Sequence, residues 1–310
     1  MPVLDTIPPR SRVLIIRLRS LGDCVLTTPA IHLLKRHRPD LELGVVVEDR
    51  FRAVFEGNPD ISAILEPSVA GAAMFRAELT INFHGGTRSA LLTGASASSW
   101  RVGFGHFRKA AVYNVRVPRA QAIFGEERVV HTAEHMASAM FFLGVPKGEI
   151  PRAFLRGGAK GRRELPYAVI HPMASSAAKT WPAERFVELG QYLRDSAGLD
   201  PLFIGAAGDD LAPFEAESFC CLRGAPLGEV MSLISDARLF VGNDSGPAHM
   251  AAAFGVPSLV LFGDSDPRIW APWRTPSETI EAGVALHAVG VDTAIAAIER
   301  LPVRMENSRR

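Results

Sequence analysis

The stretch Val241-Gly242-Asn243-Asp244-Ser245-Gly246-Pro247-Ala248-His249 joins a short apolar strand to a helix that starts abruptly. Its centre is rich in turn-forming residues, and Pro247 suits the first helical turn, where a missing N–H costs nothing. A helix that begins at the carboxyl edge of a sheet presents backbone N–H groups and a positive dipole end, which together bind anions. The stretch therefore predicts either a capped turn without a ligand or an anion site, in which Asp244 accepts hydrogen bonds from sugar hydroxyls.

A second connection of this kind runs from His171 to Pro182, between an apolar strand and an amphipathic helix. It carries Ser175, Ser176 and Lys179. A lysine on a loop is usually only solvated. Small hydroxyl side chains and a lysine at the carboxyl end of a strand also suit a phosphate group, and this loop is the second candidate anion site.

A third connection lies near the N-terminus, where the apolar strand 13–17 is followed by Arg19-Ser20-Leu21-Gly22-Asp23 and then by a helix. Asp23 falls at the entrance of that helix. An acid at this position caps the helix and complements its dipole. The same position also places the carboxylate at the carboxyl edge of the sheet, where ligands gather.

Apolar runs alternate with helical patterns along the whole chain. Strands are predicted at 13–17, 43–48, 64–65, 79–83, 101–104, 167–170, 202–204, 219–222, 239–241 and 258–262. This alternation predicts an α/β protein with parallel sheets and helices on both faces. The polar segment 147–166 is the predicted linker between two domains.

Four motifs in order resemble glycosyltransferase family 9, the heptosyltransferases that use ADP-heptose to build the lipopolysaccharide inner core. The motifs are Arg19-Ser20-Leu21-Gly22-Asp23 with Thr27-Thr28-Pro29-Ala30, His171-Pro172 with Lys179-Thr180-Trp181-Pro182, the stretch 241–249, and Gly263-Asp264-Ser265-Asp266-Pro267. The resemblance implies the GT-B architecture, in which two Rossmann-like domains face one another across a cleft. We expect residues 1–158 to bind the acceptor and residues 164–290 to bind the nucleotide sugar, with the C-terminal helix 292–301 packing back on the first domain.

The implied reaction moves a heptose from ADP-L-glycero-D-manno-heptose to a hydroxyl of a lipopolysaccharide core precursor, with inversion and without a metal or other cofactor. The attacking hydroxyl must lose a proton, which a carboxylate can take, and Asp23 matches the aspartate assigned as the base in the family. Lys179 is expected to stabilise the charge that develops on the ADP leaving group. The expected donor-site residues are Ser175, Ser176, Lys179, Asp209, Asp244, Ser245, Gly246 and His249. The expected acceptor-site residues are Gly22 and Arg88.

Several alternatives stay open. One alternative is a donor with another nucleotide, and another is an acceptor other than lipopolysaccharide. Asp210 is the alternative to Asp209 for contact with the nucleotide ribose. His131-Thr132-Ala133-Glu134-His135 matches the H-x-x-E-H pattern of inverted zinc peptidases. Asp264-Ser265-Asp266 has the D-x-D form of a metal site found in a different glycosyltransferase fold.

Composition and charge bear on the compartment and the partners. The chain is 47% hydrophobic and 22% charged, as in ordinary soluble proteins. The N-terminal residues lack the apolar core of a secretory signal, and three cysteines make no disulfide framework, so a cytoplasmic enzyme is expected. Residues 1–163 carry a formal net charge of +9 and residues 164–310 one of −8. We expect the basic half to meet the anionic lipopolysaccharide acceptor and, transiently, the inner face of the inner membrane; no nucleic-acid partner is expected.

Overall fold

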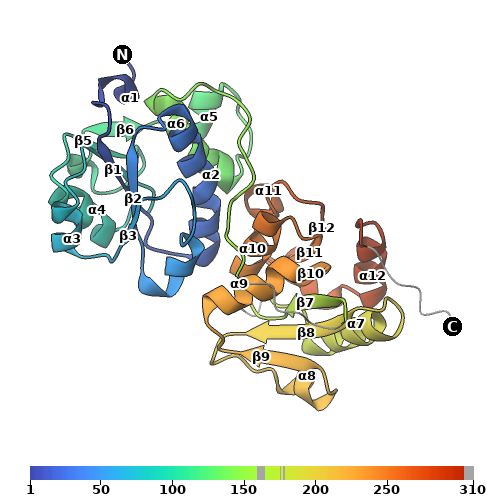
Figure 1. Cartoon of the computed structure of the whole chain (residues 1–310). Coiled ribbons are helices and arrows are strands. Elements are labelled where there is room, and N and C mark those ends of the chain that lie inside the picture. The colour runs from blue at the N-terminus through green and yellow to red at the C-terminus, as the bar shows by residue number, and fades with distance from the viewer. Residues whose placement is uncertain (159–164, 175, 177–178, 304–310) are drawn as a thin grey trace. The chain divides into compact units, whose positions relative to one another are not determined.

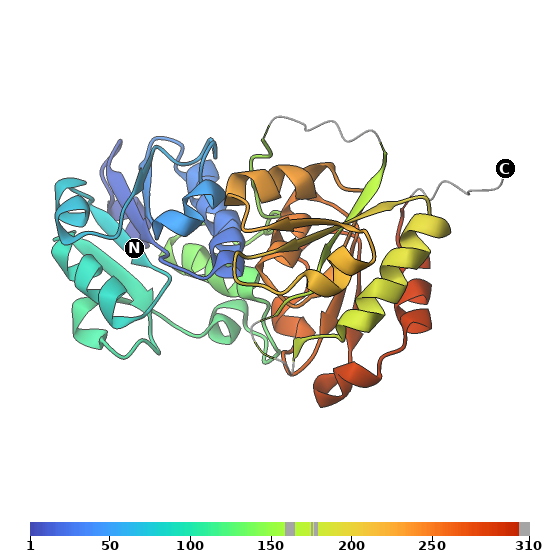
Figure 2. The ribbon, with the colours of Figure 1, turned by 90° about the horizontal axis from the view of Figure 1, so that it is seen from below.

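The structure is a computed structural model that describes residues 1–158, 165–174, 176 and 179–303. The chain forms two compact units, Met1–Arg156 and Gly157–Arg310. Each unit contains its own six-stranded sheet, and Figures 1 and 2 show helices on both faces of each sheet. The predicted α/β class with two parallel-sheet domains is confirmed.

The first sheet has the strand order β3-β2-β1-β4-β5-β6, and all its neighbouring strands are parallel. Its strands are β1 Arg12–Ile16, β2 Glu42–Val46, β3 Ala63–Leu65, β4 Leu79–Asn82, β5 Trp100–Phe104 and β6 Val115–Val117. Four of the five residues of β1 are buried, as expected for a parallel strand covered on both faces. The sequence pattern did not predict β6, a three-residue edge strand that is too short to show periodicity.

The helical elements of the first unit are α1 Val3–Thr6, α2 Leu21–His37, η1 Asp49–Val54, α3 Val69–Met74, α4 Thr87–Ala95, η2 Ala110–Val112, α5 Ala120–Phe124 and α6 Thr132–Leu143. One core cluster joins Leu14 and Ile16 of β1 to Ala72 of α3 and Leu92 of α4. Val13 and Ile15 point to the opposite face of the sheet because strand side chains alternate. Burial of both sets fixes β1 as the central strand.

The second sheet has the order β12-β11-β10-β7-β8-β9 and is also parallel. Its strands are β7 Tyr167–His171, β8 Asp200–Gly205, β9 Cys220–Arg223, β10 Leu239–Asn243, β11 Ser258–Phe262 and β12 Ser277–Glu281. Its helical elements are α7 Ala183–Asp195, α8 Ala212–Ala216, α9 Leu227–Asp236, α10 Gly246–Phe254, α11 Pro267–Trp270, η4 Gly283–Ala288 and α12 Val291–Glu299. The sequence pattern did not predict β12.

Both sheets have the same topology. Starting from the first strand of each unit, the spatial order is 3-2-1-4-5-6, and the chain reverses direction across the sheet between β1 and β4 and between β7 and β10. A reversal of this kind opens a crevice at the carboxyl ends of the two strands, where ligands bind. The connections after β1, β4, β7 and β10 are therefore the places where a site is expected.

The C-terminal helix α12 belongs to the second unit, and the expectation that it packs back on the first domain is corrected. Its buried residues Ala294 and Ile298 lie in one core cluster with Phe186 of α7 and Leu261 of β11. An apolar helical face needs a core to pack against, and the nearest strands and α7 of its own unit provide that core.

The boundary between the units lies two residues before the predicted end of the first domain. With this boundary the first unit has 20 basic and 14 acidic residues, a formal net charge of +6, and the second unit has −5. The charge asymmetry keeps its sign but is smaller than the sequence halves indicate, because the basic residues 160, 162 and 163 belong to the second unit.

The helices among the described residues all lack the length and apolarity that a membrane span requires.

Candidate active site

Asp23 lies in the first turn of α2, directly beyond the carboxyl end of β1. Its Oδ2 accepts hydrogen bonds from the Ser20 hydroxyl at 3.0 Å and from the Ser20 backbone N–H at 3.4 Å, in a capping box. The Asp23 side chain is 23% exposed. The carboxylate therefore caps the helix and also stays accessible, so the capping role and a role toward a ligand are compatible.

Arg17 is the buried partner of Asp23. Its Nη1 lies 3.4 Å from Asp23 Oδ1, and its side chain is only 5% exposed. Burial lowers the pKa of Arg17, and the Asp23 carboxylate opposes that shift. Arg17 also donates to Thr27 Oγ1 at 3.2 Å and lies 3.1 Å from the sulfur of Met136. These contacts hold the guanidinium and, through it, the Asp23 carboxylate in one place.

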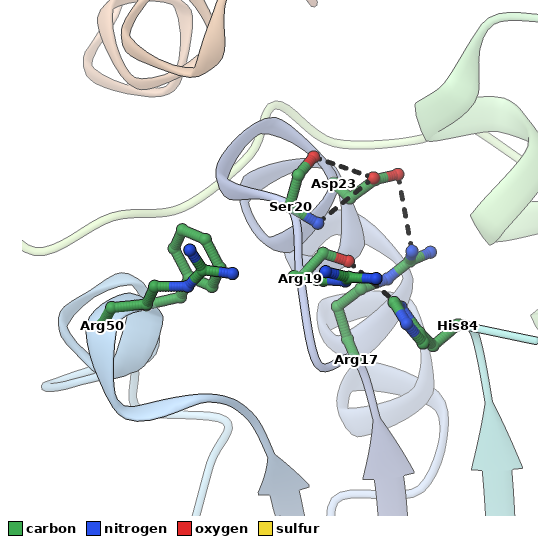
Figure 3. A pocket seen from close by; sticks show the side chains of 7 residues that line it. Arg17, Arg19, Ser20, Asp23, Arg50 and His84 are labelled. Carbon is green, nitrogen blue, oxygen red and sulfur yellow. Dashed lines mark hydrogen bonds and ion pairs between the residues drawn. The ribbon is translucent and has the colours of Figure 1, made fainter. Parts of the chain in front are cut away.

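A cavity of about 520 Å³ opens beside Asp23. It is lined by Arg17, Arg19, Ser20, Asp23, Arg50, Phe51 and His84. Figure 3 shows that these residues come from three segments: the β1–α2 connection, η1 and the loop after β4. The cavity thus lies at the reversal point of the first sheet.

His84 and Arg50 define two sides of the cavity. His84 Nδ1 lies 3.2 Å from the Arg19 carbonyl oxygen, and burial, with the charge of Arg17, lowers the pKa of His84. The Arg50 guanidinium lies over the Phe51 ring, 4.7 Å from its centroid. Arg17 and Arg50 were not predicted as site residues, although each is an arginine just beyond the carboxyl end of an apolar strand.

The two expected acceptor residues are placed differently. Gly22 is buried inside α2, next to Asp23. Arg88 does not line the cavity; it donates to the Pro67 carbonyl oxygen at 3.1 Å and lies 3.7 Å from Glu48. Glu48 also forms an ion pair with Arg50, which lines the cavity, at 2.9 Å. Glu48 therefore connects Arg88 to the cavity wall.

In the second unit, Lys179 lies among carboxylates. Its Nζ is 3.6 Å from Asp244 Oδ2 and 3.9 Å from Asp264 Oδ1. Ser265 also donates to Asp244 Oδ2 at 2.6 Å. The structure thus brings together three of the four sequence motifs, which contribute Lys179, Asp244 and the 263–267 loop.

Asn243 fixes the two loops that carry these residues. Its side-chain amide donates to the Pro172 carbonyl oxygen at 2.7 Å, and its Oδ1 accepts from the Trp181 backbone N–H at 3.0 Å. Asn243 is fully buried at the end of β10. This role of Asn243 was not predicted from the sequence, although a side-chain amide at the end of a buried strand needs hydrogen-bond partners of this kind.

The start of α10 has the predicted form, with Ser245 as the N-cap and Pro247 in the first turn. The Ser245 hydroxyl makes no cap hydrogen bond; it lies 3.0 Å from Nδ1 of His171. Burial lowers the pKa of His171 to about 4, so this ring is neutral at pH 7. Gly246 opens the helix, and His249 is buried on it, with its ring centroid 6.2 Å from that of Trp270.

The remaining expected donor residues lie on loops of the second unit. Ser176 is exposed, and its carbonyl oxygen accepts from the Lys179 N–H at 3.1 Å; Ser175 lies outside the described residues. Asp209 accepts from the Ala206 N–H at 2.6 Å, whereas Asp210 accepts from the Ala212 N–H at the start of α8. Both acids therefore hold the local backbone through one hydrogen bond each.

The H-x-x-E-H segment does not have the geometry that the zinc peptidase alternative requires. His131 precedes α6 as its N-cap, and its Nδ1 accepts from the Ala133 N–H at 3.1 Å. Glu134 pairs with Arg128 at 2.7 Å and caps the helix through the His131 N–H. His135 stacks on Phe104 at a centroid distance of 4.0 Å. His131 and Glu134 therefore cap the start of α6, and His135 packs within the first unit.

The buried ring of His135 predicts a pH-dependent stability of the first unit. Burial lowers the pKa of His135 to about 4, and nearby His106 and Arg17 act in the same direction. The unfolded chain protonates this ring near pH 6.5, so stability is complete above that pH and is lost as the pH falls toward 4. We expect His135→Phe, which keeps a ring against Phe104, to reduce this loss by about 2 kcal/mol between pH 7.5 and pH 5. Hydrogen-exchange protection of β4 and β5 at pH 7.5 and pH 5 measures the loss of stability. An equal loss in the wild type and in His135→Phe would show that His135 is not its cause.

The two acids of the D-x-D segment have separate roles. Asp266 caps α11 through the Arg268 N–H and pairs with the Arg268 side chain at 2.7 Å. Asp264 is 52% exposed and faces Lys179. Across the described ranges, no three His, Cys, Asp or Glu side chains are grouped as a metal site would require.

Comparisons with known proteins agree with the motifs. The profile of glycosyltransferase family 9 (heptosyltransferase) matches residues 75–285. Lipopolysaccharide heptosyltransferase 3 of Escherichia coli K12 is 28% identical over 292 residues, which covers 83% of each chain. A family 9 glycosyl transferase of Veillonella parvula superposes with a TM-score of 0.81 at 20% identity, over 94% of this chain and 97% of that chain. The E. coli heptosyltransferase WaaC, solved with ADP, gives a TM-score of 0.76 at 21% identity, over 93% and 99%.

The structural likenesses establish the fold, and the two parallel-sheet domains are those of the GT-B class. The family profile covers more than half of the chain and includes the motifs around Lys179, Asp244 and Asp264. The chain therefore belongs to glycosyltransferase family 9, the heptosyltransferases, and is a glycosyltransferase.

Proposed function

We propose that this enzyme transfers a heptose from ADP-L-glycero-D-manno-heptose to a hydroxyl of a lipopolysaccharide inner-core acceptor. The transfer inverts the anomeric carbon and needs no metal ion. The names of its relatives support the proposal, since they are lipopolysaccharide heptosyltransferases and one was solved with ADP. In this proposal the first unit binds the acceptor and the second binds the donor.

The observation that carries the proposal is the accessible Asp23 carboxylate, fixed by Ser20 and Arg17 beside a cavity. In the reaction, the acceptor oxygen attacks the anomeric carbon of the heptose and its proton passes to Asp23. The bond between that carbon and the ADP oxygen breaks, and its electron pair stays on the diphosphate. A single displacement of this kind inverts the anomeric carbon. Asp23 acts as the general base.

The leaving diphosphate needs positive charge, which the second unit supplies without a metal in this proposal. Lys179 is 25% exposed, and its ammonium group already lies among acidic oxygens. A bound diphosphate replaces the exposed Asp264 as the partner of Lys179. Backbone N–H groups at Ser245 and Gly246, at the start of α10, add the positive end of a helix dipole.

The other donor assignments extend this picture. Ser176 lies on the Lys179 loop, and we propose that it contacts the phosphates together with Ser175, its neighbour in the sequence. Asp209 binds the nucleotide ribose, with Asp210 as the alternative. Asp244 and His249 orient the donor from β10 and α10. Gly22 lets the acceptor approach Asp23, and Arg88 contacts the acceptor from the far side of Glu48.

We also propose that the enzyme works in the cytoplasm at the inner face of the inner membrane, where a basic surface of the first unit attracts anionic lipid and acceptor. This basic surface consists of Arg108, Lys109 and Arg116, which are exposed and have no ion pair among the described residues. Arg101 is not part of this basic surface, because it is half-buried and donates to the Ser98 and Val112 carbonyl oxygens. Lys109 also borders an apolar groove that contains the exposed Leu91.

We expect Arg108→Ser with Lys109→Ser to weaken binding to anionic vesicles by about ten- to thirtyfold, since each basic residue near such a surface contributes ~1 kcal/mol. ADP affinity should not change. Raising the salt concentration should increase the apparent KM for acceptor much more than that for donor. The matched control is Arg10→Ser with Arg36→Ser, which removes two exposed charges elsewhere on the same unit. The assignment would be contradicted if both double variants lost vesicle affinity equally. It would also be contradicted if the wild-type enzyme did not bind anionic vesicles.

The donor assignment is tested by thermal unfolding with ADP, UDP, GDP and CMP. A ligand at about 100 times its Kd stabilises the folded form by ~2.7 kcal/mol. For a unit of this size, that corresponds to a rise in Tm of roughly 5 to 10 °C. Of the four nucleotides, only ADP should produce this rise in Tm. A larger rise with another nucleotide would replace ADP in the proposal.

A further inference from the structure

Resting on the proposed function, we propose that the cavity beside Asp23 is an anion pocket, in which Arg19 and Arg50 hold a carboxylate or phosphate of the acceptor next to the hydroxyl that reacts. The cavity volume of about 520 Å³ is in the range of small-molecule sites. The pocket lies wholly within the first unit, so its geometry depends on that unit alone.

The charge of the cavity wall favours an anion. Three arginines and one aspartate line it. Arg17 is buried against Asp23 and is therefore already neutralised. Arg19 and Arg50 remain, and both are exposed. Arg50 pairs with Glu48, which does not line the cavity and is shared with Arg88. Among the described residues, Arg17, Arg19, Arg50 and Arg88 therefore face only two acids, Asp23 and Glu48.

Arg50 is held in position for such a ligand. Two of its nitrogens donate to Glu48 Oε2, at 3.1 Å and 2.9 Å. Its guanidinium plane is supported by the Phe51 ring. The side chain is still 62% exposed, so further N–H donors can reach a ligand. In Figure 3, Arg50 extends from η1 toward the loop that carries Arg19, Ser20 and Asp23.

Arg19 supplies the second guanidinium. It belongs to the β1–α2 connection, four residues before Asp23 in the chain. Within the described part of the chain, no carboxylate lies at ion-pair distance from it, although its backbone carbonyl oxygen contacts His84. An arginine binds a carboxylate or a phosphate through paired N–H donors. Arg19 and Arg50 together suit one such group.

His84 has a different role in this pocket. Its Nδ1 faces the Arg19 carbonyl oxygen and therefore carries the proton, which leaves Nε2 as an acceptor. His84 thus accepts a hydrogen bond from a sugar hydroxyl and does not bind the anion. The pocket recognises an acidic sugar by one oxyanion and at least one hydroxyl.

The test uses the full chain with Arg19→Gln and Arg50→Gln together. The acceptor KM should rise about ten- to a hundredfold, because charge-assisted hydrogen bonds are lost. The KM for ADP-heptose should stay within about twofold. The control Arg10→Gln with Arg36→Gln should change neither. Arg19→Lys with Arg50→Lys keeps the charges and should restore part of the acceptor affinity, which separates anion binding from misfolding.

Ligand-observed NMR without donor distinguishes the sources of the anion. Wild-type enzyme should bind glucuronate or glucose 6-phosphate at least about tenfold more tightly than methyl glucoside, and the preferred one of the two identifies a carboxylate or a phosphate. The glutamine variant should lose the preference. If that variant keeps the wild-type acceptor KM and anion binding while transfer proceeds, the pocket assignment is overturned and the proposed function stands. If wild-type enzyme binds the anions selectively but transfers nothing from ADP-heptose, the pocket stands and the proposed function fails.

Discussion

Asp23→Asn is expected to lower kcat by at least about a hundredfold, the usual scale of general-base catalysis. An amide cannot accept the proton of the acceptor hydroxyl. The Asn side chain still carries an oxygen that can accept from the Ser20 N–H and hydroxyl, so the helix cap should persist. Steady-state kinetics with saturating donor and acceptor measure the loss.

The controls for Asp23→Asn concern Arg17, which loses its buried ion-pair partner. Loss of one partner of a buried pair destabilises a protein, so hydrogen-exchange protection of β1 and α2 must show that the first unit of the variant is folded. ADP affinity should match that of the wild type. Asp5→Asn removes an exposed acid from α1 and should leave kcat unchanged. Near-normal turnover of folded Asp23→Asn would remove Asp23 from the mechanism.

Lys179→Ala is expected to weaken ADP binding about ten- to a hundredfold and to lower kcat about a hundredfold or more. ADP binding weakens because a charge-assisted hydrogen bond to the diphosphate is lost. The value of kcat falls because Lys179 no longer stabilises the charge that develops on the diphosphate in the transition state. Adenosine binding should change little, because adenosine lacks the phosphates. Calorimetry with both ligands measures the difference.

The matched control for Lys179 is Arg185→Ala, which removes a partly exposed basic residue of α7 that pairs with Glu188. It should leave ADP binding unchanged. If Lys179→Ala weakens ADP and adenosine equally, Lys179 positions its loop and does not bind phosphate. If chelator abolishes wild-type activity and a divalent ion restores it, a metal supplies the charge instead.

Much of the fold could be predicted from the sequence because central parallel strands are apolar throughout. Val13–Ile16 and Leu239–Val241 are both fully buried, and both were predicted as strands. The edge strands β6 and β12 were not predicted, since their residues are partly exposed and lack a continuous apolar run. The location of both candidate sites followed from the strands, because loops after central strands converge at the edge of a sheet.

Other features depend on tertiary structure. The apolar face of α12 was predicted, but periodicity shows only that a helix packs, not against which core. The H-x-x-E-H spacing would place His131 and His135 on one face of a helix, yet His131 has extended backbone angles and precedes α6 as its N-cap. Arg17 and Asp23 are six residues apart and Arg50 and Glu48 are two residues apart, so each ion pair is local in the sequence. The sheet brings these two segments together with His84 from the loop after β4. No spacing in the sequence shows that these three segments line one cavity.

The most direct test of the central claim is transfer by purified enzyme with ADP-heptose and a lipopolysaccharide core acceptor in excess EDTA. Mass spectrometry identifies the product, and NMR gives the configuration at its new anomeric carbon. The account predicts one added heptose with the configuration opposite to that of the donor, and the same product after chelation. Retained configuration, or transfer that requires an added divalent ion, would contradict it.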